Sequence, residues 1–200
     1  YGLHFPEMNR IIDKHEKYVK LVSNCGLRKN IKEAELETMV KDSMGIELSE
    51  RDETVLKEYA SKITDMYVLR ERLEKYLTQI LREIAPNFSE LATPVLAARL
   101  IALAGGMNKL AKKPSSTIQL LGAEKALFRY LRGRGRSPKH GVLYTHALVQ
   151  KAALKNRGKV ARLISSKLSI AIKMDYYGHD NKAEEMKKEL ENRINSLVSK

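Results

Sequence analysis

The chain has 200 residues, 37 of them Lys or Arg and 24 Asp or Glu, which gives a formal net charge of +13. Its hydrophobic content of 43% argues against a globally disordered chain. The single cysteine excludes an intramolecular disulfide and a cysteine-based zinc site. The sequence contains no run of eighteen apolar residues, so no membrane span is predicted.

The positive charge is confined to one half of the chain. Residues 1–90 hold 15 basic and 17 acidic side chains, a net of −2, whereas residues 91–200 hold 22 and 7, a net of +15. Between residues 91 and 174 there are seventeen basic side chains and one acidic side chain, Glu124. Folding does not require such an imbalance and self-repulsion opposes it, so it indicates a polyanionic partner, with RNA or DNA as the first candidate.

Two helical segments are predicted before residue 45. Apolar residues follow helical spacing from Pro6 until the break at residues 24–26, and a shorter segment from residue 31 to 44 ends at Gly45. A third helix is expected to begin at the capping-box-like residues 49–52 and to end before Pro86. Its length is then roughly 55 Å, at about 1.5 Å per residue.

The third helix carries a heptad pattern, which is typical of a coiled-coil seam. Arg70 occupies the one core position that is not apolar, where a polar residue tends to fix register or partner. We expect a long antiparallel coiled-coil hairpin that also self-associates, although a helix packed within its own chain would show the same pattern. The predicted dimerisation residues are Leu56, Tyr59, Ile63, Met66, Arg70, Leu73, Leu77 and Ile80.

In the part of the chain beyond Pro86, further helices are predicted over residues 95–103, after Gly122, over 158–175 and over 181–198. Residues 112–116 and 132–141 have the composition of loops, and residues 142–144 could form a brief strand without a partner. The predicted fold class is all-α, with a coiled-coil domain over residues 1–88 and a compact helical domain over residues 89–200.

Two of these helices place their cations on one face. Over 158–175 the cationic face would hold Lys159, Arg162, Ser166, Ser169 and Lys173, opposite an apolar side formed by Val160, Ile164, Leu168 and Ala171. After Gly122 it would hold Lys125, Arg129 and Arg132, opposite Leu127 and Tyr130. Arg134, Arg136, Lys139 and His140 lie on the loop between the helices, so one basic surface suited to phosphates is predicted.

Signals for catalysis are weak. Residues 133–136 lack the spacing of a phosphate-cradling loop, and Asp175, His179 and Asp180 flank a glycine turn, where helix capping is the better interpretation than a metal site. Glu124 lies in a first helical turn, where the helix dipole favours a carboxylate; alternatively it pairs with a basic side chain or accepts from a partner. We predict no active site, no metal and no cofactor.

Residues 122–129 (GAEKALFR), 137–141 (SPKHG) and 155–163 (KNRGKVARL) closely resemble the Nop-domain family, the core scaffold proteins of box C/D guide ribonucleoproteins. The resemblance extends through residues 43–49 and 84–87 to residues 1–6, and thus covers essentially the whole chain. The additional arginines 134 and 136, and the absence of long lysine-rich tails, make it similar to an archaeal member. Threonine at 145, with His146 one place later, departs from relatives that have Tyr-His there, which puts a base contact by that histidine in doubt.

The resemblance implies a coiled-coil domain that pairs two copies and a Nop domain that binds kink-turn RNA together with a small ribosomal-type kink-turn protein. It also implies docking of the fibrillarin methyltransferase, which performs 2′-O-methylation, through a preceding domain that this chain lacks, so a start at Tyr1 suggests truncation. Localisation would be cytoplasmic in an archaeon and nucleolar in a eukaryote, with no membrane partner. The candidate residues for RNA or partner binding are Gly122, Ala123, Glu124, Lys125, Arg129, Arg132, Arg134, Arg136, Lys139, His140, Arg157, Lys159, Arg162 and Lys173.

Three other functions compete with a non-catalytic box C/D scaffold. The first is a Nop-type scaffold of a spliceosomal ribonucleoprotein. The second is a nucleic-acid-processing enzyme that uses Glu124 or the residues around Asp175, and the third is a coiled-coil module whose basic half binds an acidic protein.

Overall fold

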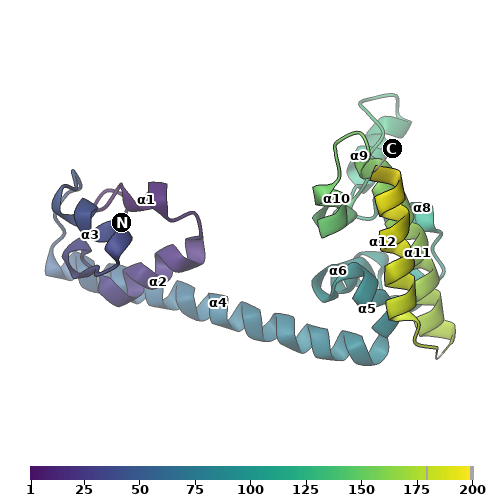
Figure 1. Cartoon of the computed structure of the whole chain (residues 1–200), viewed down its shortest axis with the longest axis horizontal. Helices are drawn as coiled ribbons and strands as arrows, with labels where there is room; N and C mark the ends of the chain where they lie inside the picture. Colours follow the sequence, from purple (N-terminus) through teal and green to yellow (C-terminus); the bar gives the residue numbers. More distant parts are fainter. Residues whose placement is uncertain (179, 199–200) are drawn as a thin grey trace. The chain divides into compact units, whose positions relative to one another are not determined.

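The structure is a computed structural model, and it describes residues 1–178 and 180–198 (Figure 1). The described residues form helices, turns and loops without a strand, which confirms the all-α prediction. The brief strand considered at residues 142–144 is instead a 3-10 helix, η2 (Val142–Thr145). The chain divides into two compact units, residues 1–73 and 74–200. This division falls inside helix α4 (Glu50–Ile84), and the domain boundary predicted at residue 88 stays a prediction.

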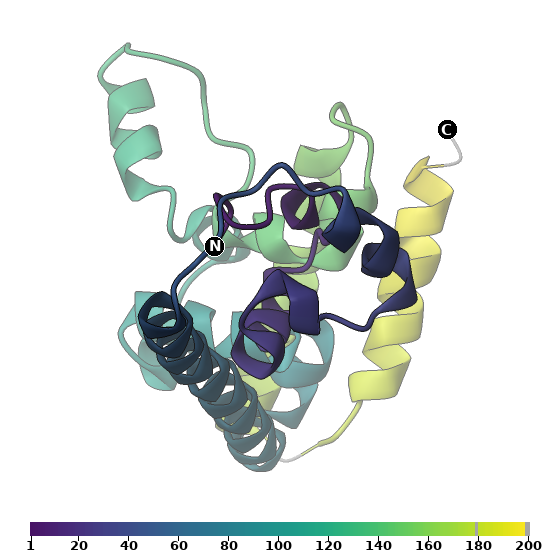
Figure 2. The ribbon, with the colours of Figure 1, turned by 90° about the vertical axis from the view of Figure 1, so that its left-hand side faces the viewer.

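The first unit consists of short helices and the first part of α4. The short helices are α1 (Met8–Ile11), α2 (His15–Cys25), η1 (Arg28–Asn30) and α3 (Ala34–Lys41). The helix predicted from residue 6 to 24 is therefore interrupted at residues 12–14. Among the described residues before α4, no single helix is comparable in length to α4. Val22 of α2 and Ala60 of α4 belong to one small buried cluster, and α2 lies beside the first part of α4 (Figure 1 and Figure 2).

Hydrogen bonds hold the loops of the first unit together. The buried His4 ring lies 2.7 Å from the Ile46 carbonyl and accepts a 3.0 Å bond from the Arg28 backbone N–H. The Arg28 guanidinium donates to the His4 carbonyl at 2.8 Å and to the Gly45 carbonyl at 2.7 Å. A Cβ at Gly45 would lie 1.9 Å from the His4 carbonyl oxygen, so only glycine fits at this crossing.

Helix α4 begins where the capping box predicts. The Ser49 backbone N–H and hydroxyl both donate to the Asp52 carboxylate, at 3.2 and 2.7 Å, and the Asp52 backbone N–H donates to the Ser49 hydroxyl at 3.3 Å. Both backbone N–H groups are thereby satisfied at a helix start. Pro86 lies just beyond the last residue of α4 and is the first residue of α5 (Pro86–Ala92), as expected for a residue that ends one helix and suits the first turn of the next.

In the second unit, helices surround α11. They are the last part of α4, then α5, α6 (Pro94–Ala104), α7 (Met107–Ala111), α8 (Ser115–Leu120), α9 (Glu124–Leu131), η2, α10 (Ala147–Lys151), α11 (Arg157–Tyr177) and α12 (Ala183–Val198). Helix α11 packs against α5, α7, α8, α10 and α12. Its buried side chains include Ile164 and Leu168, at the centre of a core that runs from Leu81 to Ile194.

Asp175, near the end of α11, holds the start of α5. Its carboxylate accepts hydrogen bonds from the backbone N–H groups of Asn87 at 3.1 Å and Phe88 at 2.8 Å. These two N–H groups lie in the first turn of α5, so they have no acceptor within that helix. The Asn87 amide also donates to Asp175 at 2.7 Å and to the Asp180 carbonyl at 2.8 Å, and its oxygen accepts from Lys182 N–H at 2.8 Å. One buried asparagine therefore joins the α4–α5 corner to the turn between α11 and α12.

Candidate functional site

The cations of the second unit lie mostly in solvent. Fourteen of the seventeen basic side chains between residues 91 and 174 are exposed, and the other three, Lys113, Arg157 and Lys167, are half-buried. Lys167 forms an ion pair with Glu189 of α12. Because α11 and its neighbours supply the core, the charged side chains are left at the surface, where self-repulsion favours an anionic partner.

Helix α9 carries the predicted cations but does not bury the face opposite them. Lys125, Arg129 and Arg132 are exposed as predicted. Tyr130, however, is 45% exposed, and no residue of α9 is buried. The prediction that this helix packs its apolar side into the chain is therefore wrong, and Phe128, 60% exposed, adds to an uncovered apolar surface. In Figure 2, α9 and the loop after it project from the other helices of the second unit.

The lone acid of the basic region closes the turn that starts α9. Glu124 Oε1 accepts from the Gly122 backbone N–H at 2.7 Å. Gly122 has a φ of +81°, and a Cβ there would lie 2.5 Å from Val142 Cγ1, so glycine is required. Glu124 thus has a role within its own chain, at the first turn of α9. Ala123, between Gly122 and Glu124, is half-buried, and its methyl group cannot form a hydrogen bond.

The loop over residues 132–141 is exposed at its tip and held at its end. Gly141 N–H donates to the Gln119 carbonyl and Val142 N–H donates to the Leu121 carbonyl, both at 2.8 Å. The buried Gln119 amide donates to the Lys139 carbonyl at 2.7 Å. Arg134 and Arg136 of this loop are exposed. The sequence contains no signal for the role of Gln119, because its partners are far from it along the chain.

An aromatic stack joins this loop to α11. The rings of His140 and Tyr144 are stacked, with their centroids 5.1 Å apart, and the Arg157 guanidinium carbon lies 5.4 Å from the centroid of the Tyr144 ring. Arg157 Nε also donates to the Ala152 carbonyl at 3.2 Å. Two predicted binding residues, His140 and Arg157, are therefore brought together through a tyrosine that the prediction did not include.

His146 has a structural role. It is buried, its Nε2 lies 2.9 Å from the Leu91 carbonyl, and its Nδ1 accepts from Leu148 N–H at 3.2 Å as the cap of α10. Burial lowers the pKa of this imidazole, against the opposing effect of the Leu91 bond. The neutral form that donates from Nε2 satisfies both contacts, so this side chain is not presented to a partner.

Helix α11 presents the predicted cationic face with one exception. Lys159, Arg162, Ser166 and Lys173 are exposed, and the four apolar residues predicted opposite them are buried. Ser169 is only 7% exposed, so its assignment to the exposed face is wrong. Because five helices pack around α11, its buried arc is wider than one side of a helical wheel suggests.

The predicted seam of α4 is largely uncovered in this chain. Tyr59, Met66 and Leu73 are 67%, 70% and 53% exposed, and Arg70 is exposed as well. Leu56, Ile63, Leu77 and Ile80 are half-buried. An apolar stripe of this kind usually marks an interaction surface.

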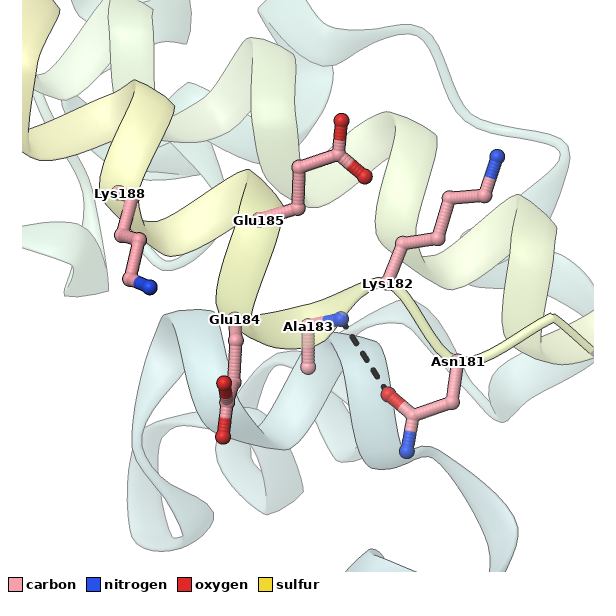
Figure 3. A pocket seen from close by; sticks show the side chains of 6 residues that line it. All are labelled: Asn181, Lys182, Ala183, Glu184, Glu185 and Lys188. Atoms are coloured by element: carbon pink, nitrogen blue, oxygen red, sulfur yellow. Dashed lines mark hydrogen bonds between the residues drawn. The ribbon is translucent and has the colours of Figure 1, made fainter.

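Asp175, at the α11–α12 turn, has a capping role of the kind that the sequence favours over a metal site. Asp175 caps α5, His179 lies outside the described residues, and the part of the chain that the structure describes contains no cluster of three or more potential metal ligands. The open hollow beside this turn, at the start of α12, is lined by residues 181–185 and Lys188 (Figure 3). There Asn181 Oδ1 accepts from Ala183 N–H at 3.2 Å, a helix cap, and the lysines and glutamates point outward. Within the described residues, no helix is both long enough and apolar enough to cross a lipid bilayer.

Comparisons with known proteins relate this geometry to one family. Residues 1–196 match the family model described as "Nop: snoRNA binding domain, fibrillarin". A NOP5 family protein of Methanocaldococcus jannaschii is 42% identical over the whole of this chain and 51% of its own length. "Nucleolar protein 58" of Candida albicans is 36% identical over 90% of this chain and 37% of its own length. This chain therefore spans about half of the first relative and 37% of the second.

A solved structure titled "Crystal structure of fibrillarin/Nop5p complex" has the same fold. It superposes with a TM-score of 0.58 at 27% identity, covering 96% of this chain and 72% of that chain.

Proposed function

Because the chain belongs to the Nop family, we propose that it is a non-catalytic scaffold of a box C/D guide ribonucleoprotein, which binds kink-turn RNA together with its kink-turn protein. The family description, the names of its relatives and the fibrillarin/Nop5p structure support a box C/D particle over a spliceosomal one. The observation that carries the proposal is the set of exposed cations on α9, on the 132–141 loop and on α11, in a region with one acidic side chain.

The binding surface consists of the exposed residues of those three segments. Basic side chains release counterions from RNA, and the packed helices fix where those side chains lie, so the surface recognises an RNA that already has its folded, protein-bound shape. Glu124 and Gly122 act indirectly, since their hydrogen bond sets the start of α9. The exposed Phe128 and Tyr130 suit the protein component of the same composite surface.

Self-association uses the seam of α4. Three of its residues are more than half exposed, and a second copy would cover them. The domain division at residue 88 belongs to this proposal: a coiled-coil part precedes it and the RNA-binding part follows it. Fibrillarin would be a further component of the particle, which would be cytoplasmic in an archaeon and nucleolar in a eukaryote.

A mobility shift with kink-turn RNA, with and without the kink-turn protein and across a salt series, tests the proposal. If about six phosphates are neutralised, the logarithm of the binding constant falls against the logarithm of salt with a slope of roughly −4 to −5. Binding should be tighter with the kink-turn protein present. Salt-insensitive binding, or equal affinity for a plain duplex with or without that protein, would contradict the proposal.

A further inference from the structure

A pocket of about 310 Å³ lies where the 132–141 loop meets the first turns of α11. Its lining residues come from three segments that are far apart in the sequence: Gln119, Ser137, Pro138, Lys139, Lys155, Gly158, Lys159 and Arg162. Four of these residues are cations, none is acidic, and the other four are neutral. Pairwise repulsion between four cations around one pocket costs free energy that an anion in the pocket would recover.

The four cations are not neutralised by ion pairs within the part of the chain that the structure describes. Among the described residues, no salt bridge involves Lys139, Lys155, Lys159 or Arg162. All four are exposed, so each ammonium or guanidinium group can move to meet a ligand. The pocket also lies at the start of α11, a helix of 21 residues, where the helix dipole adds to the positive potential.

Gln119 forms the floor of this pocket and is 9% exposed. Its amide Nε2 donates to the Lys139 carbonyl at 2.7 Å and lies 3.4 Å from the Gly158 carbonyl, so one side chain ties the loop to the first turn of α11. Gly158 allows the close approach, because a Cβ there would lie 3.2 Å from Lys139 Cβ. The distance between Lys139 on the loop and the cations of α11 therefore depends on Gln119, an uncharged residue.

We propose that this pocket binds one backbone phosphate of the RNA, and that Gln119 is the positioning residue that holds Lys139 opposite Lys159 and Arg162. The inference rests on the proposed function and adds to it Lys155, Gln119 and a discrete anion subsite. Recognition is of a phosphodiester and not of a base, because the lining offers cations and a hydroxyl but no exposed aromatic ring.

The first test compares two lysines that carry the same charge. Lys155→Gln removes a cation from the pocket, whereas Lys109→Gln removes an exposed cation of α7 that does not line it. Binding to the kink-turn RNA with its kink-turn protein is measured across a salt series. We expect Lys155→Gln to weaken binding about fivefold near 0.1 M salt and to reduce the salt slope by roughly 0.7–0.9, and Lys109→Gln to change neither.

An unchanged slope for Lys155→Gln, or an equal reduction for both variants, would overturn the pocket. Failure of the proposed function looks different, since the unmodified chain would then show no salt-dependent preference for the protein-bound RNA.

The second test uses Gln119→Met, which keeps a similar shape but removes the hydrogen-bond donor. A positioning role predicts that the salt slope falls by roughly the same 0.7–0.9, although no charge has been removed. A purely structural role would lower the melting temperature and leave the slope as it was. A normal slope in a folded Gln119→Met variant would overturn the positioning role, and Lys155→Gln tests the pocket even if the methionine variant does not fold.

Discussion

The two units of this protein hold themselves together in different ways. The buried apolar cluster of the second unit has 26 members among the described residues, and that of the first has seven. The loops of the first unit are joined by hydrogen bonds such as those of His4 and Arg28, and its part of α4 leaves Tyr59, Met66 and Leu73 more than half exposed. A unit with a sufficient core can carry unbalanced charge on its surface, whereas a unit with a small core retains apolar surface for a partner.

The largest expected effect is on the core of the second unit. Phe88→Ala removes a side chain that is fully buried, so we expect the free energy of unfolding to fall by about 3–5 kcal/mol in a urea titration. Phe128→Ala makes the same chemical change on α9, where the ring is 60% exposed, and should cost less than about 0.5 kcal/mol. Similar losses for the two variants would mean that α9 is covered by its own chain in solution.

The second prediction concerns the capping of α5. Asp175→Ala leaves two backbone N–H groups without their acceptor and removes one of the two acceptors of the buried Asn87 amide, so it should cost about 2–3 kcal/mol in the same titration. Asp180→Ala is the matched control, since Asp180 contributes its backbone carbonyl to the same turn. If Asp180→Ala were the more damaging of the two, the capping role would be wrong.

The third prediction addresses the charged surface. Lys125→Ala with Arg129→Ala should weaken binding to the RNA–protein complex about tenfold and reduce the salt slope by roughly 1–2, with helicity by circular dichroism unchanged. Lys109→Ala with Lys112→Ala lowers the net charge equally, on α7 and the residue after it. Equal weakening by both pairs would attribute binding to net charge instead of to α9.

The smallest expected effect is on the first unit and its seam. Arg70→Leu makes the heptad pattern fully apolar, so self-association should become tighter by about 1 kcal/mol, or roughly fivefold, in sedimentation equilibrium. Arg72→Leu adds the same side chain away from the seam and should leave association unchanged. Weaker association of Arg70→Leu would show that this arginine contributes favourably to the interface.

The sequence predicts features that depend on neighbouring residues. The capping box at Ser49, the end of α4 before Pro86 and the buried side of α11 depend on spacing within one segment, and each is confirmed. The errors arise where the surroundings of a helix matter. Ser169 is buried because α11 is packed on several sides, whereas Tyr130 lies on α9, a helix without a buried residue, and is 45% exposed.

Long-range hydrogen bonds could not be predicted in this way. Gln119 contacts residues 20 and 39 positions away, and Asn87 contacts Asp175 88 positions away. Spacing within one segment does not identify such partners, because a glutamine or asparagine side chain can hydrogen-bond to whichever polar group the fold brings near it.

The contact between α5 and α12 has a consequence for how this protein is made. The Asn87 side chain and the Lys182 backbone that it binds are 95 residues apart, and Met186, Leu190 and Ile194 of α12 close the same core. On the ribosome, the apolar sides of α5 and α11 must wait for α12 to be synthesised. Until then the nascent chain exposes both an apolar surface and an excess of cations. Because the core closes late, the nascent chain is at risk of premature contact with nucleic acid or a chaperone.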